Sequence, residues 1–278
     1  MSADVTPDES AFQDRLDFAL EAAAAARDLI LEHFRSAELQ VESKSDASPV
    51  TAADRGAEVL IRERLASDFG SDGILGEEFG EKPSDNGFRW ILDPIDGTKS
   101  FVHGVPLFGT LIGVEYQGEL VVGVSAFPAL DEVVYARKGG GAWWKIGDHE
   151  PVKAACRSTP TLAEGTFCFT SNTRWKTLGR GETFERLCAT AAITRGWGDC
   201  FGHMLVATGR SDVMVGPHLS PWDAAALVPI LQEAGGHFID WNGEASIYSG
   251  DGMSVTDALR DEILTIVAET TTPASQLS

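Results

Sequence analysis

Apolar segments separated by glycine, proline and acidic residues dominate the chain between Gly73 and Gly139. Short runs of this kind, bounded by turn residues, are typical of β-strands. We expect strands within 73–78, 88–93, 108–117, 119–128 and 131–139. The last three follow one another with only one or two residues between them, which predicts an antiparallel meander. This region therefore has to form a sheet that other elements cover.

Two helices are expected before the sheet region. An alanine-rich segment from about Ser10 to Phe34 has apolar residues at helical intervals, which predicts a long amphipathic helix. A second helix is expected from about Thr51 to Phe69. Its start carries Thr51 followed three residues later by Asp54, a pattern that resembles a capping box.

Strand-like and helical segments alternate after the glycine run 139–141. Such alternation favours an α/β layered fold over a separate helical bundle. With 278 residues, 43% of them hydrophobic, the chain can bury the core of one large domain. We expect a single domain over 1–278, with halves of roughly 1–150 and 151–270 that share a cleft, and a frayed tail at 271–278. The strands of the second half are expected within 165–170, 193–197, 211–216 and 236–240, and its helices near 182–190, 200–209 and 221–234.

The chain is strongly acidic. It has 42 Asp and Glu against 22 Lys and Arg, which gives a formal charge of -20 and a pI near 4.6. Such a surface repels nucleic-acid phosphates and anionic membranes, so neither is an expected partner. Two explanations of the acidity stay open, namely solubility and adaptation to a salty cytoplasm. In either case an anionic substrate needs a local positive site.

We expect a soluble, cytoplasmic protein. The N-terminal segment 1–16 is acidic where a targeting peptide is basic, and no run approaches the roughly 18 apolar residues of a membrane span. The cysteines form no Cys-x-x-Cys pair, so a reduced, structural role is expected for each of them. They are Cys156, Cys168, Cys188 and Cys200.

The segment ILDPIDGTKSF, residues 91–101, places two carboxylates in one turn. Asp93 follows a buried strand, and the carboxyl ends of strands are where open α/β sheets bind ligands. Pro94 restricts the backbone, and Gly97 permits a tight turn. Asp93 and Asp96 held so close would raise each other's proton affinity, a conflict that a divalent cation removes. With only oxygen ligands at hand, Mg²⁺ is the cation that fits.

Two further acidic sites have the same kind of position. Glu77 and Glu78 end another apolar strand, and Asp223 lies at the start of a helix whose first residue is Pro221. Each has a simpler interpretation when it is taken alone. Asp223, three residues after Ser220, suits helix capping, and the Glu77-Glu78 pair suits a solvated loop. Likewise, an Asp-Gly dipeptide such as 96–97 suits an ordinary turn.

The conjunction of the three acidic sites favours a metal site, because the simpler interpretations do not predict it. GEE at 76–78, DPIDGT at 93–98 and WDAAAL at 222–227 together resemble the inositol monophosphatase superfamily of Mg²⁺-dependent phosphatases. The resemblance extends to Lys44-Ser45-Asp46, to 49–54 and to 209–223, and so covers nearly the whole chain.

The resemblance implies alternating α-β-α-β-α layers, with the site in a cleft between two halves. It implies two or three Mg²⁺ ions and hydrolysis by an activated water, without a covalent enzyme intermediate. The implied catalytic residues are Glu77, Asp54 and Thr98, and the implied metal ligands are Glu77, Asp93, the Ile95 carbonyl, Asp96 and Asp223. The implied substrate-binding residues are Glu77, Ile95, Asp96, Gly97, Thr98, Arg195, Asp199 and Asp223.

The segment RGWGDCFG at 195–202, followed by LVATGR, is most similar to the histidinol-phosphate phosphatase branch of the superfamily. This branch removes phosphate from L-histidinol phosphate in histidine biosynthesis. Asp199 is expected to face the amine or imidazole, and Arg195 the phosphate side or a partner subunit. A salt bridge between Arg195 and Asp199 that fixes the loop is the alternative. Relatives are commonly homodimers, which predicts a homodimer here.

Other functions stay open at this point. An inositol-1-monophosphatase or a broad small-molecule monophosphatase would use the same metal chemistry. A protein-interaction module is the alternative from another class, although such a module would be free to lose its acidic residues. Lys99 and Ser100 depart from the Thr-Asn that many inositol phosphatases have there, and neither Lys99 nor His218 is assigned a catalytic role.

Overall fold

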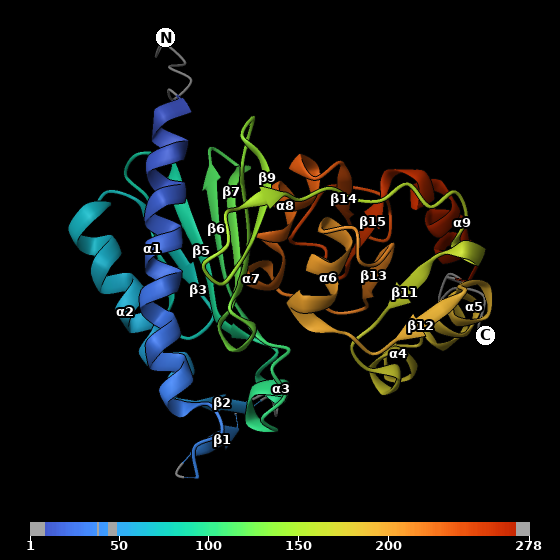
Figure 1. The fold of residues 1–278 in the computed structure, drawn as a ribbon, viewed down its shortest axis with the longest axis horizontal. Helices are drawn as coiled ribbons and strands as arrows, with labels where there is room; N and C mark the ends of the chain where they lie inside the picture. The colour runs from blue at the N-terminus through green and yellow to red at the C-terminus, as the bar shows by residue number, and fades with distance from the viewer. Residues whose placement is uncertain (1–8, 38, 44–48, 271–278) are drawn as a thin grey trace.

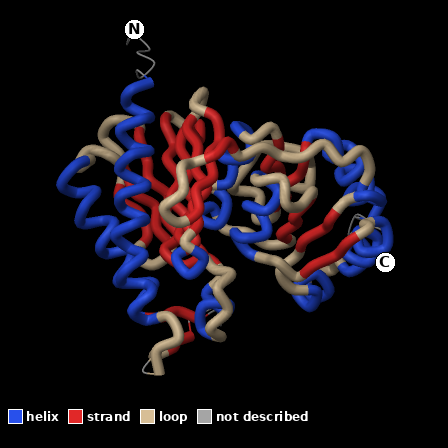
Figure 2. Tube along the Cα trace, viewed as in Figure 1, coloured by secondary structure: helices blue, strands red, loops and turns tan. Residues whose placement is uncertain are grey.

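The computed structural model describes residues 9–37, 39–43 and 49–270. It has alternating helical and sheet layers, α-β-α-β-α, which run from left to right in Figure 1. Helices α1 and α2 cover the outer face of the first sheet, α6, α7 and α8 lie between the sheets, and α4, α5 and α9 lie beyond the second sheet. The expected α/β layered fold is confirmed. Figure 2 shows most strands gathered in two groups separated by helices, while β1 and β2 form a small separate pair.

The elements follow in chain order. The first half contains α1 (Glu9–His33), β1 (Val41–Ser43), β2 (Pro49–Thr51), α2 (Ala52–Asp68), β3 (Gly73–Gly76), β4 (Gly80–Lys82), β5 (Phe88–Asp96), α3 (Thr98–Val102), β6 (Gly109–Tyr116), β7 (Glu119–Phe127), η1 (Pro128–Leu130), β8 (Glu132–Arg137) and β9 (Gly141–Ile146). The second contains β10 (Val152–Lys153), η2 (Leu162–Glu164), β11 (Thr166–Cys168), α4 (Asn172–Thr177), α5 (Gly181–Thr190), β12 (Ile193–Arg195), α6 (Asp199–Ala207), β13 (Val213–Gly216), α7 (Pro221–Ala224), α8 (Leu227–Glu233), β14 (Gly236–Ile239), β15 (Gly252–Thr256), η3 (Asp257–Leu259) and α9 (Arg260–Thr270).

The larger sheet has eight strands in the order β10-β9-β8-β7-β6-β5-β3-β4. Its β6-β7-β8 part is the expected antiparallel meander. Strands β3 and β5 are parallel, so their carboxyl ends lie at one edge of the sheet. The second sheet has the order β12-β11-β13-β15-β14, with β12, β11 and β13 parallel and the other pairs antiparallel.

The two N-terminal helices form where the sequence predicts them. Helix α2 begins after Thr51, whose hydroxyl accepts the Ala53 N–H at 3.2 Å. The Asp54 carboxylate in turn accepts the Thr51 N–H at 2.8 Å, which completes the predicted capping box. The buried residues of α1 recur at helical spacing and pack on α2 and β7. Patterning and capping chemistry therefore agree with the tertiary structure here.

Apolar clusters fill the spaces between the layers. One lies between the N-terminal helices and the larger sheet, a second around the central helices, and a third between the smaller sheet and α9. Arg210, after α6, pairs with Glu132 on β8 and joins the two halves. Within the described residues, no helix is both long and apolar enough to cross a membrane.

Several elements were not expected from the sequence. The helix α9 is the longest of them, and its buried Ile263, Ile266 and Val267 recur at helical spacing, so a signal was present. Strand β15, which pairs with both β13 and β14, was also missed. The predicted frayed tail 271–278 and the Lys44-Ser45-Asp46 segment lie outside the described residues.

Candidate active site

Three acidic side chains come from the carboxyl ends of the parallel strands β3 and β5. Glu77 directly follows β3, as expected. Strand β5 continues to Asp96 instead of ending at Asp93, and its pairing with β6 shifts register between these two residues. Pro94 lies inside this irregularity, where the missing N–H interrupts no regular ladder. Asp93 and Asp96 are thereby held on a backbone that is fixed by neighbouring strands.

The fourth carboxylate arrives from the other half of the chain. Asp223 is the third residue of α7, which packs against β5 and β6. Its carboxylate accepts the Ser220 N–H at 2.8 Å, as in the predicted capping box. Carboxylate oxygens of Asp93, Asp96 and Asp223 nevertheless all lie within 4.8 Å of one another. Helix capping and cluster formation are therefore not alternatives for Asp223, because one oxygen serves the cap and the group still faces the cluster.

The cluster combines one buried carboxylate, Asp93, with two partly buried ones, Asp96 and Asp223. Asp93 is 2% exposed, and burial together with the charges of Glu77, Asp96 and Asp223 raises its pKa well above the ordinary value. Burial and the charge of Asp223 raise the pKa of Asp96 to about 7, and burial raises the pKa of Asp223 to about 6. No Lys or Arg of the described ranges forms an ion pair with these three carboxylates. Such an all-oxygen, mutually repelling donor set fits a hard divalent cation.

Glu77 and Asp54 border this group. Glu77 is close enough to Asp93 to share a hydrogen bond with it. Asp54 is buried on α2, and burial, with contributions from the charges of Glu78 and Glu77, raises its pKa to about 6. The Asp54 carboxylate accepts the Thr51 hydroxyl at 2.6 Å. A carboxylate with a pKa in this range is suited to accept a proton near neutral pH.

The turn after β5 has the geometry that its glycine predicts. Gly97 has φ +83°, a left-handed conformation that favours glycine, and it precedes α3. The Thr98 hydroxyl donates to the Ile95 carbonyl at 3.1 Å, and the Ile95 N–H donates to Asp93 at 3.0 Å. No hydrogen bond joins Thr98 to Asp54 in the described part of the chain, so the implied pairing of these two residues stays a prediction.

The structure separates Asp199 from Arg195. A Cβ added to Gly97 would lie 3.4 Å from the Asp199 carboxylate, so Asp199 borders the turn. Burial and the charge of Asp96 raise the pKa of Asp199 to about 7, although Lys99 opposes the rise. Arg195 instead donates to the Thr194 carbonyl at 2.8 Å and lies near the Trp197 ring. Among the described residues these two side chains form no ion pair, so the salt-bridge alternative for the loop is wrong.

Three residues that were not assigned to the site from the sequence form hydrogen bonds with it, namely Cys200, Thr170 and Glu58. The backbone N–H of Cys200, at the start of α6, donates to the Asp96 carboxylate. The Asp199 N–H donates to the Thr170 hydroxyl at 2.9 Å, and Asp199 has φ +52°. Glu58 binds the turn that follows Glu77. Of these, Glu58 left a sequence signal, since it follows Asp54 by one helical turn. All four cysteines are free thiols, as expected.

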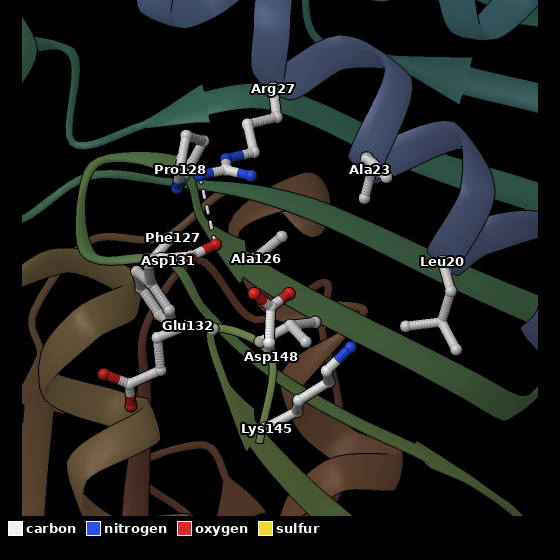
Figure 3. Close-up of a pocket in the computed structure, with 13 residues that line it drawn as sticks. Leu20, Ala23, Arg27, Ala126, Phe127, Pro128, Asp131, Glu132, Lys145 and Asp148 are labelled. Carbon is white, nitrogen blue, oxygen red and sulfur yellow. Dashed lines mark ion pairs between the residues drawn. The ribbon is translucent and has the colours of Figure 1, made fainter. Parts of the chain in front are cut away.

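A hollow of about 230 Å³ lies elsewhere, between α1 and the end of β7 (Figure 3). Arg27 and Asp131 form an ion pair of 3.1 Å across it. Lys145 and Asp148 also line it, but none of the predicted site residues does. The chemistry implied by the sequence is therefore at the strand ends and not in this hollow.

The chain matches a known protein family along most of its length. The profile described as inositol monophosphatase family matches residues 12–272. The chain belongs to the inositol monophosphatase family. It is therefore an enzyme that hydrolyses phosphoric monoesters, and members of this family are generally metal-dependent.

Individual members of the family resemble the chain along most of its length. A histidinol-phosphatase of Chlorobaculum parvum is 47% identical over 86% of this chain and 90% of its own. A histidinol-phosphatase of Mycobacterium tuberculosis is 38% identical over 91% of this chain and 97% of its own. The crystal structure of the extragenic suppressor protein suhB from Bartonella henselae superposes with a TM-score of 0.84, with 26% identity over 93% of this chain and 100% of that chain.

Proposed function

We propose that this chain is a Mg²⁺-dependent histidinol-phosphate phosphatase, which converts L-histidinol phosphate and water into L-histidinol and phosphate. The observation that carries the metal-dependent chemistry is the convergence of Asp93, Asp96 and Asp223 within 4.8 Å. The choice of substrate is supported by the histidinol-phosphatases that are 47% and 38% identical to this chain. The homodimer and the cytoplasmic location stay predictions.

The residues that would hold two or three Mg²⁺ ions are Glu77, Asp93, the Ile95 carbonyl, Asp96 and Asp223. The donor set supports this assignment, because it offers only oxygens and because the buried carboxylates repel one another. When bound, Mg²⁺ would offset this negative charge, bind phosphoryl oxygens and lower the pKa of a water molecule. The strongly acidic chain could then accept an anionic ester, since the ions reverse the local charge.

The chain's own residues supply orientation and proton acceptance. The Gly97 and Thr98 N–H groups would donate to the phosphate, which the left-handed turn at Gly97 permits. Asp54 would accept the proton of the attacking water, which suits its pKa of about 6, and Glu77 and Thr98 would help to orient that water.

Asp199 would face the cationic end of L-histidinol, because its carboxylate borders the turn without an arginine partner. Arg195 would lie farther out, at the mouth of the site or against a partner subunit, in keeping with its exposed position on β12.

Phosphate release from the purified chain tests the proposal. L-histidinol phosphate and inositol 1-phosphate are compared as substrates, each with Mg²⁺ and with EDTA. We expect EDTA to abolish turnover and kcat/KM to favour histidinol phosphate by about 100-fold, equivalent to about 2.7 kcal/mol of differential transition-state binding. A flat or reversed preference would indicate an inositol or broad small-molecule monophosphatase. No turnover of either ester would contradict the proposal and favour an interaction module.

A further inference from the structure

A carboxylate and a guanidinium lie directly behind the turn that carries Glu77. Glu58 and Arg62 are one helical turn apart on α2, and Arg62 Nε donates to Glu58 Oε1 at 2.7 Å. The Glu58 side chain is completely buried. A buried carboxylate keeps its charge only if strong donors surround it, so its neighbours define what it does.

Those donors belong to the turn between β3 and β4. Glu58 Oε2 accepts the Glu78 N–H at 2.8 Å, and Oε1 accepts the Phe79 N–H at 3.2 Å. Arg62 donates to the Gly80 carbonyl in the same turn. The Glu77 N–H donates to the Leu92 carbonyl of β5 at 3.2 Å. Glu77 is thus fixed on one side by β5 and on the other by the Glu58–Arg62 pair.

The backbone at Gly76 lies in direct contact with the side chains of Glu58 and Arg62. A Cβ added to Gly76 would lie 2.0 Å from Glu58 Oε1 and 2.8 Å from Arg62 Nη2. Separations of this size are not possible between real atoms, so the pair occupies the space that any side chain at position 76 would need. The glycine that precedes Glu77 therefore makes room for the carboxylate behind it.

The same helix also carries Asp54. Asp54 precedes Glu58 by four residues, so both side chains lie on one face of α2. Asp54 is near enough to Glu77 and Glu78 for their charges to contribute to its pKa. Helix α2 therefore carries Asp54 itself and, through Glu58, contacts the turn that follows Glu77.

We propose that Glu58, supported by Arg62, is a positioning residue that holds Glu77 in place for metal binding. The inference rests on the proposed function, because it requires divalent cations at the acidic cluster. Replacing the Glu58 carboxylate by an amide would remove one of its two acceptor oxygens, so either the Glu78 N–H or the Phe79 N–H and Arg62 would lose their acceptor, and Glu77 would lose its fixed orientation. Groups that orient metal ligands typically affect metal affinity by roughly 10–100-fold.

Mn²⁺ binding to the full chain distinguishes this role from a purely structural one. Binding is measured by isothermal titration calorimetry and by electron paramagnetic resonance, at a temperature where circular dichroism shows every variant to be folded. The variants are Glu58→Gln, Gly76→Ala and the matched control Asp212→Asn. Asp212 is a completely buried carboxylate paired with Arg157 in the second half. Gly76→Ala removes no charge and displaces the Glu58 carboxylate by steric contact alone.

We expect Glu58→Gln to weaken Mn²⁺ binding by roughly 10-fold or more and Gly76→Ala to change it in the same direction. Asp212→Asn should lower the unfolding temperature without changing Mn²⁺ affinity. The metal concentration that gives half-maximal turnover should rise more than kcat falls, since added metal compensates for a misplaced ligand. If Glu58→Gln does not fold, Gly76→Ala decides the question.

Unchanged Mn²⁺ affinity in folded Glu58→Gln, or in folded Gly76→Ala when Glu58→Gln does not fold, would overturn the inference while leaving the proposed function intact. An equal loss of affinity in Asp212→Asn would also overturn it, because the effect would then follow from stability in general. If the wild-type chain bound no Mn²⁺, the metal site itself would be wrong, and the proposed function would fail together with the inference.

Discussion

The two ends of the adjacent strands β3 and β5 hold buried carboxylates in opposite environments. Asp72, immediately before β3, is 1% exposed and accepts hydrogen bonds from Arg15 Nε at 2.9 Å, Trp90 Nε1 at 2.8 Å and Asn86 Nδ2 at 2.7 Å. At the carboxyl end, Asp93 and Asp96 face each other and Asp223, and the structure gives them no basic partner within its described ranges. The Asp72 carboxylate therefore has a buried counter-ion, whereas the described residues provide none for Asp93 and Asp96.

The presence or absence of a counter-ion indicates which carboxylates stabilise the fold and which serve the active site. A buried carboxylate that is paired with arginine and fully hydrogen-bonded costs little to keep, and breaking the pair is strongly destabilising. Carboxylates that lie this close together without a basic partner in the described ranges repel one another, which favours the binding of a cation there. The comparison thus predicts that mutations at the two ends will affect different measurements.

The largest effect is expected at the unpaired end. Asp96→Asn should reduce turnover at saturating Mg²⁺ by more than the roughly 100-fold that loss of an orienting group can cost, because Asp96 is a proposed ligand itself. Its metal-free form should be as stable as wild type or more stable, since one repelling charge is gone. Phosphate release and urea unfolding in EDTA measure the two properties. Near wild-type turnover would contradict the assignment of the cluster.

Asp72→Ala should have the opposite profile. The substitution leaves Arg15 buried without its counter-ion, which should lower the free energy of unfolding by about 3–5 kcal/mol. Turnover and Mn²⁺ affinity of the folded fraction should stay near wild type, as measured well below the unfolding temperature. A loss of Mn²⁺ affinity comparable to that of Asp96→Asn would show that the two strand ends are not independent.

The pH dependence of stability should also differ between the metal-free and metal-bound protein. In the metal-free fold the pKa values of Asp54 and Asp223 rise to about 6 and that of Asp96 to about 7, from an ordinary value of 3.8. Between pH about 4 and 7 the folded state then binds more protons than the unfolded state. The free energy of unfolding in EDTA should therefore fall as pH rises through this window.

Saturating Mg²⁺ should suppress this fall, because metal binding replaces the protons. The buried His203 opposes it, since burial lowers the His203 pKa to about 3 and its contribution to stability is lost as pH falls below about 6.5. Comparison with Asp96→Asn removes the His203 contribution, which both proteins share. An identical pH profile for the two proteins in EDTA would show that the Asp96 charge does not strain the fold.

The smallest effect concerns Asp199, a carboxylate that forms no ion pair with the described residues and is proposed to act on substrate and not on metal. Asp199→Ala should lower kcat/KM for L-histidinol phosphate by about 10-fold more than for p-nitrophenyl phosphate, which lacks a cationic end; this corresponds to about 1.4 kcal/mol. Equal losses on both esters would assign Asp199 to the structure of the α6 start, where it has φ +52°.

Parts of the fold that depend on local patterns were predictable from the sequence. The helices α1 and α2 follow from apolar periodicity and from the Thr51–Asp54 capping box. The β6-β7-β8 meander follows from short apolar runs with tight turns. Helix α9 was missed although Ile263, Ile266 and Val267 carry the same kind of signal. The continuation of β5 past Pro94 was missed because a proline ordinarily argues against a strand interior.

The candidate site was predictable in its members but not in their arrangement. The acidic strand ends, Pro221 at the start of α7 and the Gly97 turn all follow from residue types at recognisable positions. The sequence offered helix capping and metal binding as alternatives for Asp223, whereas the fold satisfies both with one carboxylate. It also left a salt bridge between Arg195 and Asp199 open, whereas in the described part of the chain Arg195 donates to the Thr194 carbonyl and forms no ion pair with Asp199.

The sequence by itself determined the helices α1 and α2, the β6-β7-β8 meander and the acidic groups at the strand ends, because dihedral preferences and apolar periodicity are local properties. Only the tertiary structure decided that Asp223 meets Asp93, that the Cys200 N–H binds Asp96 and that Glu58 lies behind Glu77. These contacts join residues from different layers, and they depend on how two sheets and their helices pack, which no local pattern encodes.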